Sequence, residues 1–187
     1  VGAGPAGIFT AYELVKQAFK GRILLIEKGV PIEKRHCPKD KTDVCINCKP
    51  YCHITTGFSG AGAFSDGKLS LCTDVGGELP DLIGAEMVQK YIDYTDKIYL
   101  DFGADTKIEG IENNDQIKEI RRKAISGGLK LVDCPIRHLG TEKAQEIYQK
   151  LQSFLVENGV EIRFGTIVDD FIIEECKILG VTLVDSM

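Results

Sequence analysis

The spacing of apolar residues predicts that the chain begins with a helix followed by a strand. Apolar or small side chains recur at helical intervals through residues 5–19, and Gly21 follows where a glycine can end a helix. Residues 22–27 form a short, nearly continuous apolar run that stops before Gly29 and Pro31. This is the pattern of a strand buried on both faces of a parallel sheet. We therefore expect the order turn, helix, strand.

Residues 30–80 lose this periodicity and are dominated by Pro, Gly, Cys, Lys and Asp. So long an irregular stretch in a compact domain is usually functional or disordered. Regular patterns then return, with helices expected at 81–102, 115–124 and 141–158 and strands at 129–136, 160–164, 167–173 and 178–184. We expect the last two strands to form a hairpin. Thr141 suits the N-cap of the 141–158 helix, and Gly159 suits the position just after its end.

The order of these elements predicts an α/β fold with an interrupted domain. We assign residues 1–80 and 141–187 to a discontinuous Rossmann-like domain that binds FAD or NAD(P), with a Cys- and Gly-rich loop over 31–80. Residues 81–140 are expected to form an inserted helical region that serves the substrate.

Composition narrows the class of partner. With 187 residues and 43% hydrophobic content, the chain can bury the core of one ordinary domain. Its formal net charge of −5 disfavours nucleic-acid binding, which needs a clustered basic excess. No stretch approaches the roughly 18 apolar residues of a membrane span, and we see no leader pattern. We expect a cytoplasmic protein without a membrane or nucleic-acid partner.

The first seven residues contain a Gly-x-Gly-x-x-Gly motif. Gly2 permits a tight turn, Gly4 lets the backbone approach a pyrophosphate, and Gly7 lets the helix pack on the strand. Glu27 ends the next strand 20 residues after Gly7, where a carboxylate can accept hydrogen bonds from both ribose hydroxyls and would repel the 2′-phosphate of NADP. The alternative is a plain strand-to-helix turn with Glu27 as a solvated strand end.

Residues 57–69 form a second glycine-rich segment, Gly-Phe-Ser-Gly-Ala-Gly-Ala-Phe-Ser-Asp-Gly-Lys-Leu. It places small residues around one hydroxyl, one carboxylate and one amine. So little side-chain bulk suggests that the backbone comes close to another group. A flexible surface loop is the alternative.

Four of the seven cysteines lie within residues 37–52, and His36 and His53 flank this segment. Thiolates suit zinc or an iron–sulfur cluster, and the Cys45-x-x-Cys48 core lets two side chains converge on one metal. A redox dithiol beside a flavin and free thiols in an ordered loop are the alternatives. The candidate metal ligands are Cys37, Cys45, Cys48 and Cys52.

Together with Arg-His-Leu-Gly-Thr at 137–141, the two glycine motifs and the cysteine cluster resemble a bacterial family of uncharacterised FAD-dependent, or NAD/FAD-utilising, dehydrogenases. This family is similar to the flavoproteins with two dinucleotide-binding domains. The resemblance runs over nearly the whole chain and implies FAD as cofactor. It implies binding through Gly2, Gly4, Pro5, Ala6, Gly7, Glu27 and Lys28, with the backbone near Val168 touching adenine.

In flavoproteins, a loop such as 57–69 lies against the flavin or the pyrophosphate. We therefore expect Ser65, Asp66, Gly67 and Lys68 near the isoalloxazine ring, with Lys68 as a candidate catalytic residue.

Arg137 and His138 are the other candidate catalytic residues. They lie between an expected strand and a helix start, from where side chains can point into a cleft. His138 can exchange a proton beside the flavin, and Arg137 can hold a substrate carboxylate by a bidentate pair. Structural roles at a domain junction are the alternative for both residues.

Both ends of the chain are expected to lack sequence. Val1 stands directly before a motif that normally follows a strand, and Met187 ends the chain after an apolar run. The family also carries a late Gly-Asp segment that binds the ribityl chain, and no counterpart occurs in these residues.

The expected function is that of an FAD-dependent oxidoreductase, in which the flavin carries hydride or electrons. Its partners would be a small-molecule substrate or an electron carrier, with NAD(P)H as a candidate electron donor. A non-redox protein that holds the cofactor, and a metal or iron–sulfur carrier on a Rossmann scaffold, are the alternatives.

Overall fold

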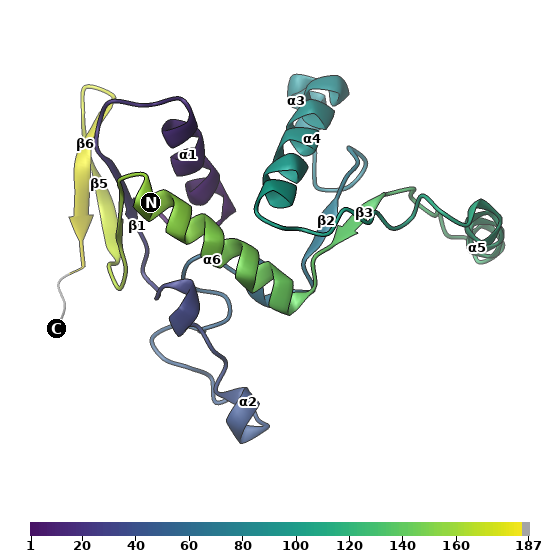
Figure 1. The fold of residues 1–187 in the computed structure, drawn as a ribbon, viewed down its shortest axis with the longest axis horizontal. Coiled ribbons are helices and arrows are strands. Elements are labelled where there is room, and N and C mark those ends of the chain that lie inside the picture. The colour runs from purple at the N-terminus through teal and green to yellow at the C-terminus, as the bar shows by residue number, and fades with distance from the viewer. Residues whose placement is uncertain (185–187) are drawn as a thin grey trace. The chain divides into compact units, whose positions relative to one another are not determined.

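The computed structural model describes residues 1–184, which fall into two compact units. The first unit joins residues 1–65 to the segment that starts at Ala144, and the second comprises residues 66–143. Helices and strands mix in both units, so the chain is of a mixed α/β type (Figure 1). Within residues 1–184, no helix combines the length and the apolar character needed to cross a membrane.

Two helix–strand pairs build the first unit. Helix α1 (Pro5–Lys16) leads to β1 (Ile23–Ile26), and α6 (Thr141–Glu157) leads to β4 (Val160–Arg163). The two strands pair in parallel, with Ile23 opposite Val160. All four elements begin and end close to the bounds expected from the apolar spacing.

One face of α6 supplies much of the first unit's core. Its buried residues recur at helical intervals, so that a single apolar stripe faces inward. The ring of Tyr12 on α1 lies 5.4 Å from the ring of Phe154 on α6, centroid to centroid, which places the two helices side by side. Fully buried members of this core include Ile8 on α1 and Ala144, Ile147, Leu151 and Leu155 on α6.

A hairpin follows the parallel pair. Strands β5 (Val168–Glu174) and β6 (Lys177–Leu183) pair antiparallel, as expected. Glu175 and Cys176 connect them with φ angles of 46° and 61°. Two successive residues of positive φ are typical of a tight turn that matches the twist of the strands.

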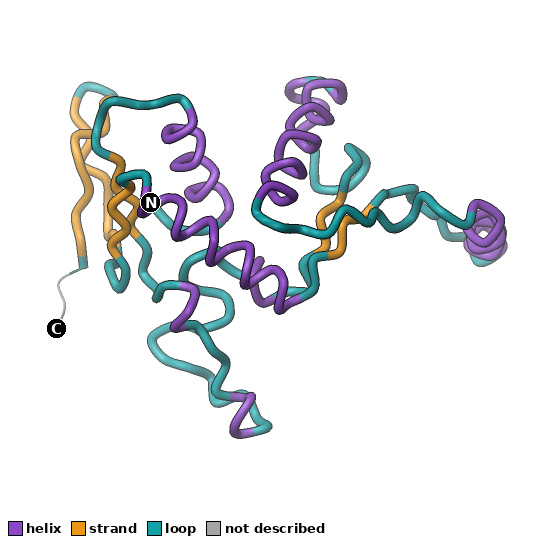
Figure 2. Tube along the Cα trace, in the orientation of Figure 1, coloured by secondary structure: helices purple, strands orange, loops and turns teal. Residues whose placement is uncertain are grey.

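Loops make up most of residues 27–65 (Figure 2), as the missing periodicity predicts. Only short helices interrupt them, namely η1 (Ile32–Lys34), α2 (Lys39–Thr42) and η2 (Gly62–Phe64).

The second unit combines helices with a short antiparallel ribbon. The ribbon pairs β2 (Lys68–Ser70) with β3 (Ile136–His138), so that Lys68 lies opposite His138. The helices are α3 (Leu79–Ile83), α4 (Ala85–Asp101) and α5 (Asn114–Ser126).

Two predictions about the second unit are wrong in detail. The helix expected at 81–102 is two helices, because Gly84 takes φ 85° and ψ 141°, which no α-helix accommodates. The strand expected at 129–136 is absent, and only its last residue belongs to β3. Pro135 has no N–H to donate to a ladder, which limits pairing just before β3.

Three further expectations, about the ends of helices and the exposure of one strand, are also corrected. Helix α1 ends at Lys16 and Gly21 does not cap it, because Ala18 already turns the chain with φ 51°. Leu24 is 42% exposed, so β1 is not covered on both faces within the described residues. Thr141 is the first residue of α6 rather than the residue before it. Gly159 follows α6 with φ 84°, as expected.

Candidate functional site

The glycine turn, residues 2–7, leads into α1 and brings main-chain atoms close together. Gly2 takes φ 86°, and its N–H donates to the carbonyl of Ile26 at 2.7 Å. A Cβ atom at Gly7 would lie 2.0 Å from the carbonyl oxygen of Gly2, so only glycine fits there. The helix and the turn therefore approach each other as closely as the motif predicts.

The N-terminal turn of α1 has no side-chain cap. Gly4 is the N-cap residue, Pro5 and Ala6 are exposed, and the first turn contains no acidic residue. The first amides of a helix lack intrahelical partners and carry the positive end of the helix dipole. A Cβ atom at Gly4 would meet no other atom within 4 Å, so the space in front of this turn is open.

Glu27 lies against the glycine turn at the end of β1. Its side chain is buried, with Oε2 accepting the N–H of Ala3 at 2.8 Å and Oε1 accepting the N–H of Gly29 at 2.7 Å. Each carboxylate oxygen retains a second lone pair. Glu27 is therefore not a solvated strand end, whereas its neighbour Lys28 is exposed.

The second glycine segment packs on the first. The N–H of Ser59 donates to the carbonyl of Ala3 at 2.7 Å, and a Cβ atom at Gly60 would lie 3.6 Å from the Cα atom of Gly4. Phe58 and Ser59 are fully buried. Residues 57–60 are therefore no flexible surface loop, and their backbone approaches the glycine turn itself.

Arg35 is a buried cation that the sequence analysis missed. Its Nη1 donates to the carbonyls of Phe58 and Gly60 at 2.5 and 2.6 Å and to the hydroxyl of Ser59 at 3.0 Å. Its Nη2 is buried and has no hydrogen-bond partner among the described residues. Burial lowers the pKa of Arg35 to about 10, although the negative charge of Glu27 acts to raise it. The guanidinium therefore stays protonated at neutral pH. The only sequence signal was one basic residue in an irregular stretch.

The start of the hairpin lies beside Glu27. The N–H of Thr166 donates to the carbonyl of Glu27 at 3.1 Å, and the N–H of Gly165 donates to the carbonyl of Gly29 at 2.9 Å. Val168 follows as the first residue of β5. Ser65 lies at the other end of the second glycine segment, where its hydroxyl donates to the carbonyl of Gly62 at 3.0 Å.

In the second unit, the β-ribbon brings three predicted site residues together. Oδ2 of Asp66 lies 2.6 Å from Nζ of Lys68, and Oδ1 lies 2.9 Å from Nε2 of His138. The hydrogen bond from Lys68 lowers the pKa of Asp66, and the hydrogen bond from His138 lowers it further. In turn, the hydrogen bond to Asp66 raises the pKa of Lys68. Gly67, between the two charged residues, takes φ 65°. All three side chains are exposed, so they can meet a ligand.

Arg137 points to the other face of the ribbon and is buried. Its Nε and Nη2 donate to the two carboxylate oxygens of Asp96 at 2.5 and 2.7 Å, and its Nη1 donates to the carbonyls of Asp105 and Lys107. The hydrogen bond to Asp96 raises the pKa of Arg137. Because Asp96 already occupies the guanidinium fork, the geometry favours the structural alternative for Arg137 over a bidentate substrate contact.

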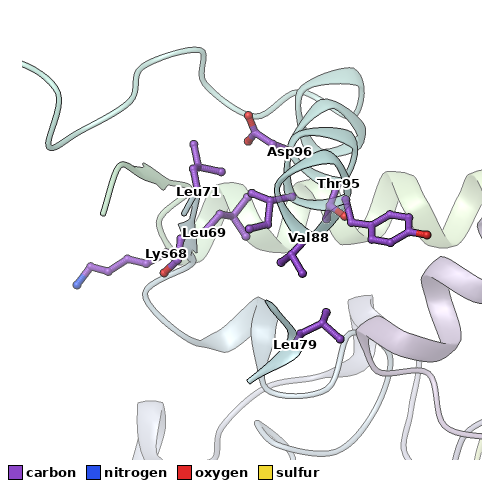
Figure 3. A pocket seen from close by; sticks show the side chains of 10 residues that line it. Lys68, Leu69, Leu71, Leu79, Val88, Thr95 and Asp96 are labelled. Carbon is purple, nitrogen blue, oxygen red and sulfur yellow. The ribbon is translucent and has the colours of Figure 1, made fainter. Parts of the chain in front are cut away.

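A largely apolar cavity of about 320 Å³ lies within the second unit (Figure 3). Leu71 from the end of the ribbon, Leu79 and Val88 contribute to its wall, and Lys68 and Asp96 are among its few charged neighbours. Ligand sites in proteins are often apolar hollows of about this size with a few polar groups.

The four cysteines of the 37–52 segment line one cavity of about 230 Å³ in the first unit. They are free thiols, half-buried at Cys37 and Cys48 and exposed at Cys45 and Cys52. Within residues 1–184, no group of three or more His, Cys, Asp or Glu side chains is arranged to hold a metal ion. The segment therefore gathers its thiols around a common space without forming a ready single-ion site.

Replacing Lys68 by alanine should raise the pKa of Asp66, because it removes the hydrogen bond and the positive charge that lower this pKa. The ammonium group stabilises the charged carboxylate, so the ion pair is present above the unfolded-state pKa of Asp66 and is lost as pH falls through its lower folded-state pKa. An NMR titration of the Asp66 side-chain carbonyl measures the midpoint. Lys90→Ala, which removes an exposed partner of Glu86, is the matched control. Equal midpoints in both variants would contradict the assignment.

Replacing Asp96 by asparagine should lower the free energy of unfolding by about 3–5 kcal/mol, because it leaves the charge of Arg137 buried without its carboxylate. Asp133→Asn is the matched control, since it breaks the exposed pair with Arg121 and should lower stability by at most about 1 kcal/mol. Denaturant unfolding of both variants measures the difference. Losses of similar size would show that Arg137 does not depend on Asp96.

The comparisons with known proteins find no family model that matches the chain. An uncharacterized protein of Clostridium beijerinckii is 40% identical over 72 residues, which span 37% of this chain and 13% of that protein. Among solved structures, the chain is similar to an L-amino acid deaminase from Proteus vulgaris, with a TM-score of 0.48 and 13% identity. That likeness covers 97% of this chain and 42% of the deaminase chain. Less than half of each of these two proteins is thus matched.

Proposed function

We propose that the first unit binds FAD at the glycine turn and that the chain is part of an FAD-dependent oxidoreductase. The observation that carries this proposal is the uncapped N-terminal turn of α1, which opens beside the buried carboxylate of Glu27. A helix N-terminus favours phosphate, and a carboxylate at the end of the next strand favours ribose. The family that the sequence resembles has the same cofactor.

The residues present fit the parts of this cofactor. The open space before Gly4 leaves room for a pyrophosphate against the first amides of α1. The lone pairs that Glu27 retains can accept the two ribose hydroxyls. Arg35 adds a buried positive charge behind residues 57–60, with one donor group still unmatched. An unpaired buried donor is rare in a folded protein, and an anionic ligand nearby would stabilise its charge.

The remaining predicted contacts complete the proposed site. The backbone near Val168 would face adenine, because the start of the hairpin is bonded to Glu27 and Gly29. Lys28 would lie at the exposed rim. By the family resemblance, Ser65, the last residue of the first unit's leading segment, would face the isoalloxazine ring. When bound, FAD supplies hydride or electron transfer. NAD(P)H would be the electron donor, and a small molecule or an electron carrier the partner.

His138 is the candidate for proton exchange with a substrate. Asp66 accepts the hydrogen bond at Nε2, so that in the neutral ring Nε2 carries the proton and Nδ1 is left as the basic atom. Lys68 holds the other oxygen of Asp66 and thereby keeps the carboxylate charged. Arg137 would act by positioning, since its contacts with Asp96 hold the strand that carries His138.

Replacing Gly4 by alanine should weaken FAD binding at least tenfold without loss of stability. The added methyl meets no protein atom within 4 Å, yet it occupies the space proposed for the pyrophosphate. Quenching of flavin fluorescence on titration with the purified protein measures the dissociation constant, and thermal unfolding checks the fold.

Gly127→Ala, at the end of α5, is the matched control for this test. A methyl there has ordinary contacts, the nearest at 3.5 Å, and FAD affinity should not change. Equal affinities in the two variants, or no binding of FAD by the unsubstituted protein, would overturn the proposed site.

A second candidate function, metal or iron–sulfur binding by the first unit, is favoured by the cavity that the four cysteines share. After anaerobic reconstitution, we expect iron with acid-labile sulfide, or zinc, in a fixed ratio to protein. Cys48→Ser should lose most of it, whereas Cys176→Ser, in the exposed hairpin turn, should lose none. A metal content that is equal in the two variants would exclude the cysteine cavity as the site.

A further inference from the structure

The β-ribbon of the second unit extends beyond its two strands. Its register pairs Lys68 with His138 and Ser70 with Ile136, and the N–H of Leu71 then donates to the carbonyl of Pro135 at 2.8 Å. Continued by one more position, the same register places Cys72 opposite Cys134. Neither cysteine belongs to the 37–52 segment, and neither has a part in the proposed flavin site.

The geometry of directly opposed residues suits a disulfide. In antiparallel strands, their Cα atoms lie roughly 4.5–5.5 Å apart, and disulfides require about 4.4–6.8 Å. Burial raises the pKa of the Cys72 thiol, and the neighbouring Cys134 thiol raises it further. Sγ of Cys134 donates to the carbonyl of Pro135 at 3.7 Å. Both cysteines are half-buried free thiols. Closing a bridge would therefore need little movement of the main chain.

We propose that Cys72 and Cys134 are a redox dithiol that closes to a cross-strand disulfide by exchange with a small disulfide such as oxidised glutathione. One cysteine thiolate attacks a sulfur of oxidised glutathione, which forms a mixed disulfide and releases one glutathione thiolate. The other cysteine thiolate then attacks the protein sulfur of the mixed disulfide and releases the second glutathione. The protein loses two electrons and two protons, and oxidised glutathione gains them.

The bridge would hold the ribbon closed at one end. The chain between the two cysteines contains α3, α4 and α5, so the bridge would close most of the second unit into one covalent loop. Leu71, next to Cys72, lines the apolar cavity, and Lys68 and His138 lie at the opposite end of the same ribbon. The redox state of the pair would thus change the stability of the ribbon next to the apolar cavity and next to Lys68 and His138.

The test is oxidation of the folded protein with oxidised glutathione, followed by alkylation of the remaining thiols and peptide mass spectrometry. We expect a peptide that links Cys72 to Cys134 and a higher midpoint of thermal unfolding, which dithiothreitol reverses. Cys72→Ser should abolish both effects and leave Cys134 as a stable mixed disulfide with glutathione. Cys176→Ser, which removes an exposed cysteine of the first unit, should leave both effects intact.

Peptide mapping of the unsubstituted protein decides the proposal even if Cys72→Ser fails to fold. Separate glutathione adducts on Cys72 and Cys134 would overturn the proposed disulfide. So would free thiols at both positions, at a concentration of oxidised glutathione that modifies the exposed cysteines. The outcome is independent of FAD binding, because no residue of the glycine turn takes part.

Discussion

A buried carboxylate ties together the main-chain segments on which the first unit's candidate site depends. Glu27 accepts the N–H groups of Ala3 and Gly29, while its own carbonyl accepts the N–H of Thr166. A charged group away from water is tolerated only when it is well hydrogen-bonded, and bonds to an ionised acceptor are among the stronger ones. The side chain of Glu27 therefore joins the glycine turn to the segment just after β1, and its main-chain carbonyl holds the start of the hairpin.

Arg35 extends this arrangement to the second glycine segment. Its bonds to the carbonyls of Phe58 and Gly60 fold residues 57–60 onto the turn. Since carbonyls bring no formal charge, the guanidinium remains a net positive centre close to the turn, with Glu27 the opposing carboxylate. The second glycine segment is thus ordered by a cation, and glycine at position 57 makes room for it, because a Cβ atom there would lie 2.7 Å from Cδ of Arg35.

The two buried arginines of the chain illustrate two solutions to the same physical problem. Arg137 has a carboxylate partner, Asp96, that matches its fork, so it is neutralised and serves the fold of the second unit. Arg35 lacks a bidentate carboxylate and keeps a donor unmatched. The structure thus distinguishes an arginine neutralised by a carboxylate from one held by main-chain carbonyls, the Ser59 hydroxyl and the face of the Phe64 ring.

The sequence by itself determined the elements whose pattern is local. The helices α1, α5 and α6, the strands β1 and β4, and the hairpin all follow from apolar spacing, and the glycine turn follows from its motif, because periodicity and turn chemistry act over a few neighbouring residues. Only the tertiary structure decided the partners of Arg35 and Arg137 and the meeting of Asp66 with His138. These contacts join residues far apart in the chain, and strand register and packing, which no local pattern encodes, bring them together.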